Sequence, residues 1–286
     1  MQTIPTIREM QAIVRAAKTS STTIGLVPTM GALHEGHLSL VRTARAHCSH
    51  VIATIFVNPL QFGPNEDLAK YPRTFERDTE LLMQEGVDYL FAPSAEEMYP
   101  QGAQTLVDVP ELGNRLDGAS RPGHFRGVAT VVSKLLHITQ PDLAFFGQKD
   151  AAQVAVLRRM VRDLNFPLEM VVCPTVREAD GLAMSSRNRY LSNEERVQAL
   201  ALSRTLQTAK TLAQQAAATP ATLREAMLHT LTSTDGVRVD YAAVVDPETL
   251  LDADDLSRET LLAVAAWVGT TRLIDNLLLP AREVQP

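Results

Sequence analysis

The chain has 286 residues, of which 45% are hydrophobic and 21% charged, as is typical of a globular protein that buries a substantial core. A formal net charge of −6 argues against a protein that coats nucleic acid. The two cysteines, Cys48 and Cys173, lie far apart in apolar segments, so the composition predicts neither a disulfide framework nor a cysteine zinc site.

The N-terminal segment lacks the pattern of a secretory signal. Pro5, Arg8 and Glu9 stand where a signal needs an uninterrupted apolar region. The longest apolar run, 261–268, is far shorter than the roughly 20 residues of a membrane-spanning helix. We therefore expect a soluble cytoplasmic protein without membrane or nucleic-acid partners.

Hydrophobic patterns predict an alternation of strands and helices over the first 175 residues. Short apolar runs rich in β-branched residues indicate strands, and runs with helical spacing indicate helices between them. The predicted strands are 24–27, 51–57, 87–92, 105–109, 142–146 and 168–173, and the predicted helices are 38–48, 75–84, 151–164 and one that follows 121–128 and reaches about residue 137. This alternation indicates a parallel sheet with helices on both faces, whose ligands bind beyond the C-terminal ends of the strands.

The pattern changes after Pro174. The elements predicted there are a polar loop at 175–192, a helix at 193–218, a helix opened by Thr219 and Pro220, and strands at 237–245, 261–268 and 272–275, the last two forming a hairpin. We therefore expect a Rossmann-like, doubly wound α/β domain over residues 1–175. A smaller α+β domain over residues 176–286 would act as its lid.

The first candidate site follows the first of these strands. The strand ends at Pro28, and a helix begins at HEGH, where His34 and His37 share one face and Gly36 leaves space for another molecule. The unpaired N–H groups and positive dipole of a helix start favour phosphate, to which imidazoles donate hydrogen bonds. The alternative interpretation is an ordinary exposed helix start.

Two further polar clusters lie near predicted loops. GQKD, residues 147–150, places Lys149 at the C-terminal end of a strand, where a ligand crevice is expected; an ordinary helix cap is the alternative. MSSR, residues 184–187, places two hydroxyls and a guanidinium on a loop able to close over phosphate; an ordinary polar linker is the alternative.

Two glutamines could contribute to a ligand site, and two common phosphate-binding motifs are missing from the sequence. Gln61 and Gln153 offer amides that suit hydroxyl and carboxylate groups, although each alone is typical of a surface residue. There is no GxGxxG after the first strand and no GxxxxGK[ST], so neither a dinucleotide fingerprint nor a P-loop explains a phosphate site.

The three clusters, in this order, resemble the signatures of the nucleotidylyl-transferase superfamily that includes class I aminoacyl-tRNA synthetases. HEGH resembles its HxGH motif and MSSR its lysine- and serine-rich second motif. Longer segments resemble one family, the pantothenate synthetases or pantoate–β-alanine ligases: PTMGALHEGHLSLV, FVNPLQFGPNEDLAKYPRT, RPGHFRGVATVV, FFGQKD and PTVREADGLAMSSRNRYLS. The likeness runs from about Thr22 to Ser192 and continues more weakly to the end.

The resemblance implies a ligase that joins pantoate to β-alanine with ATP. The pantoate carboxylate would attack the α-phosphate of Mg-ATP and release pyrophosphate, and the β-alanine amine would then attack the pantoyl adenylate and release AMP. A homodimer through the N-terminal domain is also implied. The motifs suit this chemistry, because adenylation needs positioning and neutralisation of phosphate charge, which donors and cations supply without a covalent nucleophile.

The resemblance also assigns site residues by motif. The catalytic residues are His34, His37, Lys149, Ser185, Ser186 and Arg187, with His37 as the proton donor; the ATP site adds Met30, Gly36, Gly147, Gln148, Asp150, Val176 and Met184. Pantoate is assigned to Asn58, Gln61 and Gln153, with Gln61 also near β-alanine.

One position departs from the family pattern, and another is a candidate ligand for Mg²⁺. Gln148 stands where the family often has glutamate, and we expect a change in local charge without loss of activity. No metal cage is visible, so we expect ATP oxygens to hold most of the Mg²⁺, with Asp78 as a candidate carboxylate ligand.

Two other functions are compatible with the motifs. A mononucleotide adenylyltransferase would use the same phosphate motif but would need a pocket for a second nucleotide. A catalytically idle ATP-binding or regulatory module would bind nucleotide without producing AMP when pantoate and β-alanine are present.

Overall fold

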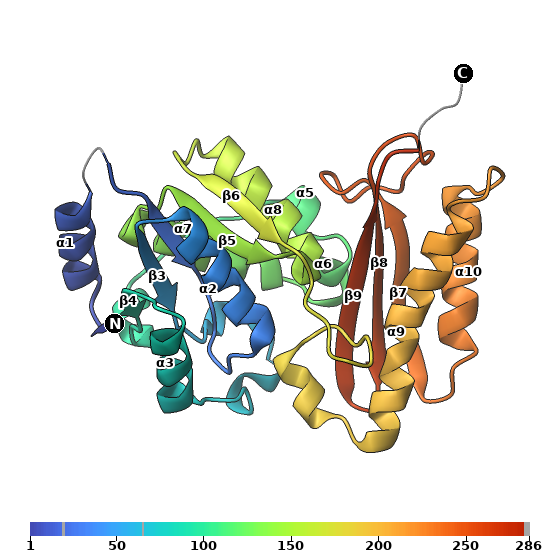
Figure 1. The fold of residues 1–286 in the computed structure, drawn as a ribbon, viewed down its shortest axis with the longest axis horizontal. Helices are drawn as coiled ribbons and strands as arrows, with labels where there is room; N and C mark the ends of the chain where they lie inside the picture. The colour runs from blue at the N-terminus through green and yellow to red at the C-terminus, as the bar shows by residue number, and fades with distance from the viewer. Residues whose placement is uncertain (19–20, 65, 283–286) are drawn as a thin grey trace.

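The computed structural model describes residues 1–18, 21–64 and 66–282, which form two adjoining parts, each built on its own sheet (Figure 1). The strands are β1 (Gln2–Ile4), β2 (Ile24–Val27), β3 (His50–Thr54), β4 (Tyr89–Phe91), β5 (Leu143–Gly147), β6 (Glu169–Cys173), β7 (Val237–Val245), β8 (Thr260–Val268) and β9 (Thr271–Leu279). The α-helices are α1 (Ile7–Ala17), α2 (Glu35–His47), α3 (Phe75–Gln84), α4 (Ala95–Met98), α5 (Pro110–Gly113), α6 (Asp117–Ser120), α7 (His124–Thr139), α8 (Ala151–Asp163), α9 (Asn193–Leu212) and α10 (Pro220–Thr232). Short 3₁₀ helices are η1 (Pro59–Gln61), η2 (Asp67–Ala69), η3 (Gln148–Asp150) and η4 (Ser186–Tyr190).

The N-terminal sheet has six parallel strands in the order β1-β4-β3-β2-β5-β6. The chain runs outward from β2 through β3 to β4, then crosses back to place β5 on the other side of β2. The winding direction therefore reverses between β2 and β5. Open α/β sheets have their ligand crevice at such a switch point, outside the C-terminal ends of the strands.

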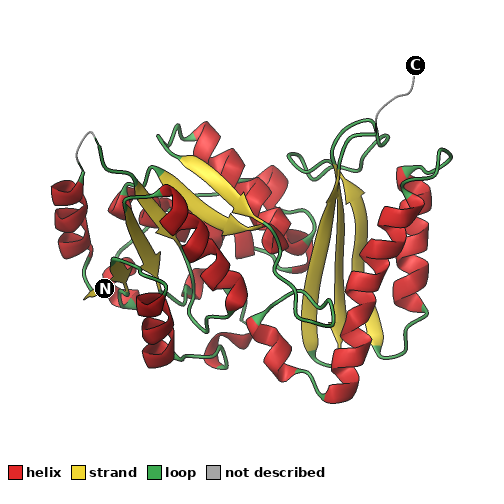
Figure 2. Ribbon diagram, in the orientation of Figure 1, coloured by secondary structure: helices red, strands yellow, loops and turns green. Residues whose placement is uncertain are grey.

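Successive residues of these strands face opposite helix layers, as the twofold repeat of a strand requires. Leu26 and Ile52 belong to the core formed with α1, α7 and α8, whereas Val51 and Ala53 belong to the core formed with α2 and α3. Figure 2 shows the strands of this part lying between helices. The predicted doubly wound α/β fold is confirmed.

The C-terminal sheet is an antiparallel meander in the order β7-β8-β9. Leu261 and Ala263 of β8 join the core shared with the N-terminal part, and Leu262 and Val264 join the core under α9 and α10. The sheet stands between the N-terminal part and these two helices (Figure 1). As predicted, Thr219 caps α10, and the part has α+β character.

Some elements differ from the sequence prediction. Residues 105–109, predicted as a strand, pair with no strand; the Thr130 hydroxyl of α7 accepts the Val107 N–H (3.0 Å) and donates its proton to the Arg126 carbonyl (2.7 Å). The edge strand β1 and helix α1 were outside the prediction, and α9 ends at Leu212, before residue 218. The three residues of β1, which end before Pro5, are too few for a hydrophobic repeat to be recognised.

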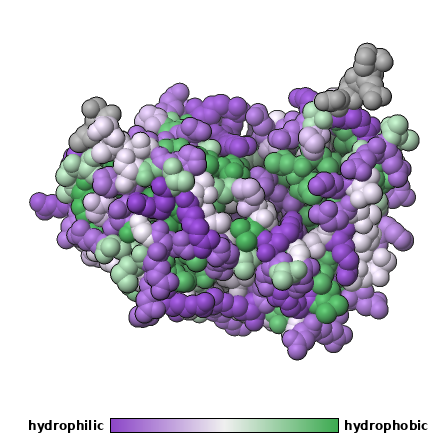
Figure 3. Space-filling model, viewed as in Figure 1, coloured by the Kyte–Doolittle hydropathy of each residue, from purple (hydrophilic) through white to green (hydrophobic). Residues whose placement is uncertain are grey.

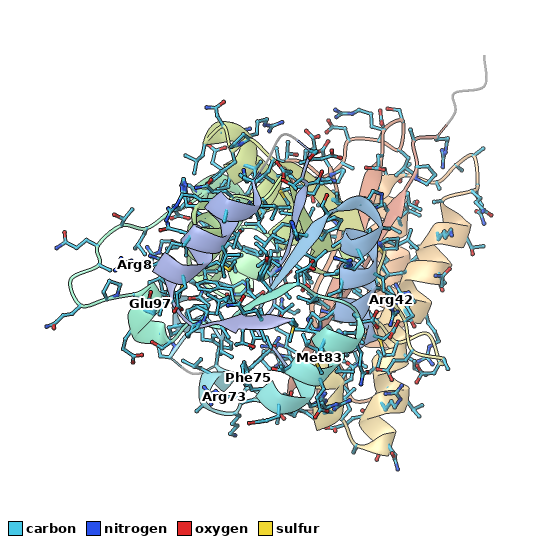
Figure 4. The ribbon with its side chains drawn as sticks, turned by 60° about the vertical axis from the view of Figure 1, so that its left-hand side comes forward. Arg8, Arg42, Arg73, Phe75, Met83 and Glu97 are labelled. Carbon is cyan, nitrogen blue, oxygen red and sulfur yellow. The ribbon has the colours of Figure 1, made fainter. Side chains whose placement is uncertain are left out.

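The surface in view is mostly hydrophilic, with small separate apolar areas (Figure 3). Two of the more exposed apolar side chains are Phe75 and Met83, at 40% and 56% exposure, and both extend from α3 (Figure 4).

Across 1–18, 21–64 and 66–282, no helix combines the length and apolar character needed to cross a membrane.

Candidate active site

A cavity of about 240 Å³ lies beyond the C-terminal ends of β2 and β5, at the switch point of the sheet. Its lining includes most of the predicted site residues: Met30, His34, Gly36, His37, Asn58, Gln61, Gly147, Lys149, Asp150, Gln153, Val176, Met184, Ser185, Ser186 and Arg187. The structure thus brings together three clusters that are far apart in the sequence. Gln148 and Asp78 are absent from this lining.

A second cavity of about 770 Å³ adjoins the first and extends toward the C-terminal sheet. Lys149, Gln153 and Arg187 line both cavities, while Trp267 and Arg272 line only the larger one. The space available to reactants is therefore bordered by both parts of the chain.

The two histidines cap the start of α2 through reciprocal hydrogen bonds. The Gly36 N–H donates to Nδ1 of His34 (3.2 Å), and the His34 N–H donates to Nδ1 of His37 (3.3 Å). A neutral imidazole has one donor and one acceptor nitrogen. Because both Nδ1 atoms accept, each neutral ring carries its proton on Nε2.

Burial keeps both imidazoles neutral. It lowers the pKa of His34 to about 4, with help from the Lys149 ammonium, and the pKa of His37 to about 3, with help from His34. The ring centroids are 4.1 Å apart. At neutral pH the pair therefore presents two adjacent Nε2–H donors without adding positive charge, an arrangement suited to phosphate oxygens.

Gly36 makes room for the His34 ring. A Cβ at this position would lie 2.9 Å from Cε1 of His34, a distance that real Cβ contacts do not reach. Gly36 thus leaves space for the imidazole of the same motif, and it also lines the cavity.

Asp78 lies under the turn that leads into α2 and is only 1% exposed. Its carboxylate oxygens accept the N–H groups of Ala32 (2.7 Å) and Leu33 (2.9 Å), together with the Thr74 hydroxyl. These bonds hold Ala32 at a φ of 51°, which is unfavourable for a residue with a Cβ. Asp78 lines neither cavity, so its contacts favour a structural role in place of the predicted magnesium role.

In the part of the chain that the structure describes, no group of three or more His, Cys, Asp or Glu side chains is arranged to hold a metal ion. Asp150, at the cavity, is instead paired with Lys149, whose Nζ lies 3.5 Å from its Oδ1.

Gln148 differs from its neighbours in the GQKD cluster. Its Nε2 donates to Oδ1 of Asn276 on β9 (3.1 Å), and it lines neither cavity. The structure therefore directs Gln148 toward the C-terminal sheet, away from the predicted ATP site.

The MSSR cluster begins the short helix η4. The Met184 N–H donates to the Val176 carbonyl (3.0 Å), and the Arg187 N–H donates to the Ser185 hydroxyl (3.2 Å). These bonds place Val176 and residues 184–187 side by side on the cavity wall, although a loop separates them in the chain.

Asn58 and Gln61 form one buried polar unit. The Asn58 amide donates to Oε1 of Gln61 (3.1 Å) and to the Gly127 carbonyl (3.0 Å), and its Oδ1 accepts the Tyr99 hydroxyl (2.8 Å). Protein groups thus satisfy Asn58, whose visible effect is to orient Gln61 toward the cavity. A Cβ on Gly127 would lie 2.2 Å from the Leu60 carbonyl oxygen, so only glycine allows η1 to pack this closely on α7.

Arg121 and His124 also line the site, although the sequence motifs alone suggested no role for them. Arg121 forms a bidentate pair with Glu66 (2.7 and 2.6 Å) and donates to Nε2 of His124 (3.0 Å). Nδ1 of His124 donates to the Gln61 carbonyl (2.8 Å). The signal was the segment RPGHFRGV, which matched the family pattern without indicating what its side chains contact.

Comparisons with known proteins show which family the chain is similar to. The family model described as pantoate-beta-alanine ligase matches residues 2–278. The pantothenate synthetase of Acidobacterium capsulatum is 60% identical, with 98% of this chain and 97% of that protein covered; that of Thermotoga neapolitana is 56% identical, with 98% and 100% covered.

Solved structures show the same similarity. Pantothenate synthetase from Thermus thermophilus superposes with a TM-score of 0.91 at 50% identity, covering 97% of this chain and 99% of that one. Pantoate-beta-alanine ligase from Francisella tularensis, complexed with beta-gamma ATP and beta-alanine, superposes with a TM-score of 0.75 at 34% identity, covering 97% of each chain. Because the family model and the relatives match along nearly the whole sequence, the chain belongs to the pantoate-β-alanine ligase family.

Proposed function

We propose that the chain is an ATP-dependent ligase that condenses pantoate with β-alanine through a pantoyl-adenylate intermediate, releasing pyrophosphate and then AMP. The observation that carries this proposal is the meeting of HEGH, GQKD and MSSR around one cavity at the switch point of the sheet. Family membership and the ligands of the Francisella tularensis relative support the choice of substrates.

In the first step the pantoate carboxylate oxygen forms a bond to the α-phosphorus of ATP, and the bond from that phosphorus to the bridging oxygen of pyrophosphate breaks. Negative charge increases on the departing pyrophosphate. His34 and His37 would donate Nε2–H to phosphate oxygens, and Lys149 and Arg187 would add positive charge. The hydroxyls of Ser185 and Ser186 would complete the cradle around the triphosphate.

The rest of the cavity lining would bind the nucleotide and the acid. Met30, Gly36, Gly147, Asp150, Val176 and Met184 line the same cavity and are the proposed nucleotide contacts. Gln61 and Gln153 would bind the hydroxyl and carboxylate groups of pantoate, with Asn58 holding Gln61 in orientation. Gln148, which faces β9, is left out of the proposed ATP contacts.

In the second step the β-alanine amine attacks the acyl carbon of the adenylate, and the acyl–phosphate bond breaks to release AMP. The larger cavity gives β-alanine a route to this carbon, because it shares Lys149, Gln153 and Arg187 with the inner one. The small C-terminal part, residues 176–286, would act as a lid over this opening.

We further propose that Mg²⁺ enters bound to ATP and is held mainly by phosphate oxygens. The saturated contacts of Asp78 support this choice, as does the lack of a metal cage in the described ranges. We also propose a homodimer through the N-terminal part, as the resemblance to the family implies. Free, buried Cys48 and Cys173 suit a reducing cytoplasm.

The experiment that tests this function is an assay of AMP, pyrophosphate and pantothenate with pantoate and β-alanine omitted in turn. We expect pyrophosphate release to require pantoate, and AMP and pantothenate to appear together only when both substrates are present. AMP release that ignores pantoate, or nucleotide binding without any turnover, would contradict the proposal.

A further inference from the structure

Strand β9 carries two neighbouring polar side chains, Asp275 and Asn276, to which the proposed reaction gives no role. Both are buried, at 3% and 5% exposure, on the outermost strand of the C-terminal sheet. Buried polar groups are costly unless they are paired, so their partners indicate what they stabilise.

The Asn276 amide binds the backbone of the GQKD turn. Its Nδ2 donates to the carbonyls of Gln148 (3.0 Å) and Lys149 (2.8 Å), and its Oδ1 accepts Nε2 of Gln148 (3.1 Å). Both amide protons and the amide oxygen are therefore used. The two carbonyls belong to η3, the turn that presents Lys149 to the cavity.

The Asp275 carboxylate binds the second phosphate loop. It pairs with the Arg177 guanidinium through two bonds, of 2.7 and 2.9 Å, and Arg177 also donates to the Gly181 carbonyl (3.1 Å). Arg177 lies directly after Val176, whose carbonyl accepts the N–H of Met184. The ion pair therefore fixes the base of the loop that carries residues 184–187.

The two loops are connected through β9. The backbone N–H of Asn276 donates to Oδ1 of Asp275 (2.8 Å), so the anchor of one loop contacts the anchor of the other. Because successive side chains of a strand point to opposite faces of the sheet, Asp275 and Asn276 reach different loops. Arg272 and Leu278 have the parity of Asn276 and also reach the N-terminal part, Arg272 through Asp117 (2.8 Å) and Leu278 through the shared core.

We propose that Asn276 is a positioning residue for adenylate formation: by holding the carbonyls of Gln148 and Lys149, it sets the Lys149 ammonium against the ATP phosphates. Through its ion pair with Arg177, Asp275 holds the loop that carries residues 184–187 in position opposite the GQKD turn. The inference rests on the proposed ligase function. It also explains why Gln148 turns toward β9, because its side chain completes the amide pair.

The expected effect is on the rate of adenylation more than on ATP binding. The Lys149 ammonium stabilises the phosphates most strongly in the transition state, where negative charge develops during adenylyl transfer. The ground-state complex with ATP keeps its many other contacts and should lose less affinity. A misplacement of about 1 Å in a catalytic group lowers a rate by as much as about 100-fold.

Two variants of the full chain test the proposal. Asn276→Asp keeps the shape but turns a carboxylate toward two carbonyl oxygens, and Asn276→Leu keeps much of the volume without any hydrogen bond. The matched control is Arg115→Ala, because Arg115 donates to the Thr249 carbonyl across the same two parts but lines neither site cavity. For each, one measures the melting temperature, the dissociation constant for ATP, and single-turnover pyrophosphate release with pantoate and without β-alanine.

We expect adenylation to slow by about 10- to 100-fold in both Asn276 variants, while ATP affinity changes far less and Arg115→Ala keeps the wild-type rate. Wild-type rates in both Asn276 variants would overturn the proposal, and so would losses of rate and ATP affinity in equal proportion. If neither variant folds, Asn276→Ser retains one donor, and a wild-type rate in that variant would likewise overturn it. Wild-type protein without pantoate-dependent pyrophosphate release would refute the ligase function itself, a separate outcome.

Discussion

The backbone N–H of His34 donates to Nδ1 of His37 at 3.3 Å, and this bond determines which nitrogen of His37 carries the proton. Because Nδ1 accepts, the neutral ring has its proton on Nε2. Burial lowers the pKa of His37 to about 3 and so keeps the ring neutral. His37 therefore lies at the cavity wall as a neutral hydrogen-bond donor through Nε2. It acts neither as a cation nor as a base.

Two amide substitutions distinguish the role of Nδ1 of His37 from the role of its Nε2. Asparagine places its amide near the position of Nδ1, and glutamine extends its amide nitrogen toward the position of Nε2. We expect His37→Asn to keep the melting temperature but to lower single-turnover adenylation by about 10² to 10³, the scale for loss of a transition-state donor. His37→Gln should retain more activity. Faster adenylation in the asparagine variant than in the glutamine variant would count against Nε2 as the working donor.

Lys149→Ala removes the ammonium that lies beside Asp150 at the cavity. We predict a loss of about 10² to 10³ in the rate of adenylation, because a fixed cation near developing phosphate charge acts mainly in the transition state. Rapid-quench measurement of pyrophosphate in a single turnover reports this step. The control is Lys210→Ala, an exposed lysine near the end of α9, which should behave like wild type. Near-normal adenylation without Lys149 would refute its assignment.

Asp78→Asn tests the structural role of the buried carboxylate. An amide keeps an acceptor oxygen for one of the Ala32 and Leu33 N–H groups, but its NH2 group meets the other N–H group. Leaving a buried N–H group unpaired in this way costs about 1–3 kcal/mol. We expect a fall of that size in the free energy of unfolding by urea, unchanged by added Mg²⁺. Asp163→Asn, at an exposed ion pair on α8, should change stability little. Undiminished stability together with a raised Mg²⁺ requirement would restore Asp78 as a metal ligand.

The stability of the protein should fall as the pH is lowered from 7 to 5. Burial lowers the pKa of His34 and His124 to about 4 and that of His37 to about 3, whereas the unfolded histidines titrate near 6.5. Below pH 6.5 the unfolded chain therefore binds protons that the folded chain does not, and stability is lost progressively until the folded pKa values are reached.

The slope of this pH dependence is the measurable quantity. Each such histidine contributes at most about 1.4 kcal/mol per pH unit to the free energy of unfolding. Urea denaturation at several pH values gives the slope, and His124→Asn, whose amide still reaches the Gln61 carbonyl, should make it shallower. Equal stability at pH 7 and pH 5 would show that these histidines are not held neutral.

Much of the fold follows from local patterns. Helix α3 spans the predicted residues, and the buried parallel strands appear as continuous apolar runs because both of their faces are covered. HEGH and GQKD meet for a topological reason: each follows a parallel strand, and the C-terminal ends of β2 and β5 lie on the same edge of the sheet. The meeting of these two clusters therefore follows from strand order, whereas the other residues of the cavity lining were assigned by the resemblance to the family.

Other features depend on partners that sequence spacing does not reveal. Val107 belongs to no strand, and a threonine hydroxyl on α7 accepts its backbone N–H in place of a neighbouring strand. Asp78 suggested a metal ligand until its oxygens were found on the N–H groups of Ala32 and Leu33. The contact of Asn276 with the GQKD turn joins residues well over a hundred positions apart, and no local propensity encodes such a pair.

The most direct measurement of the proposed mechanism follows oxygen from pantoate. With both carboxylate oxygens of pantoate labelled with ¹⁸O, attack on the α-phosphorus transfers one labelled oxygen to the nucleotide when β-alanine displaces AMP. We predict that mass spectrometry finds one ¹⁸O in the released AMP and the other in pantothenate. Unlabelled AMP, or label in inorganic phosphate with ADP as the product, would contradict an adenylate formed at this cavity.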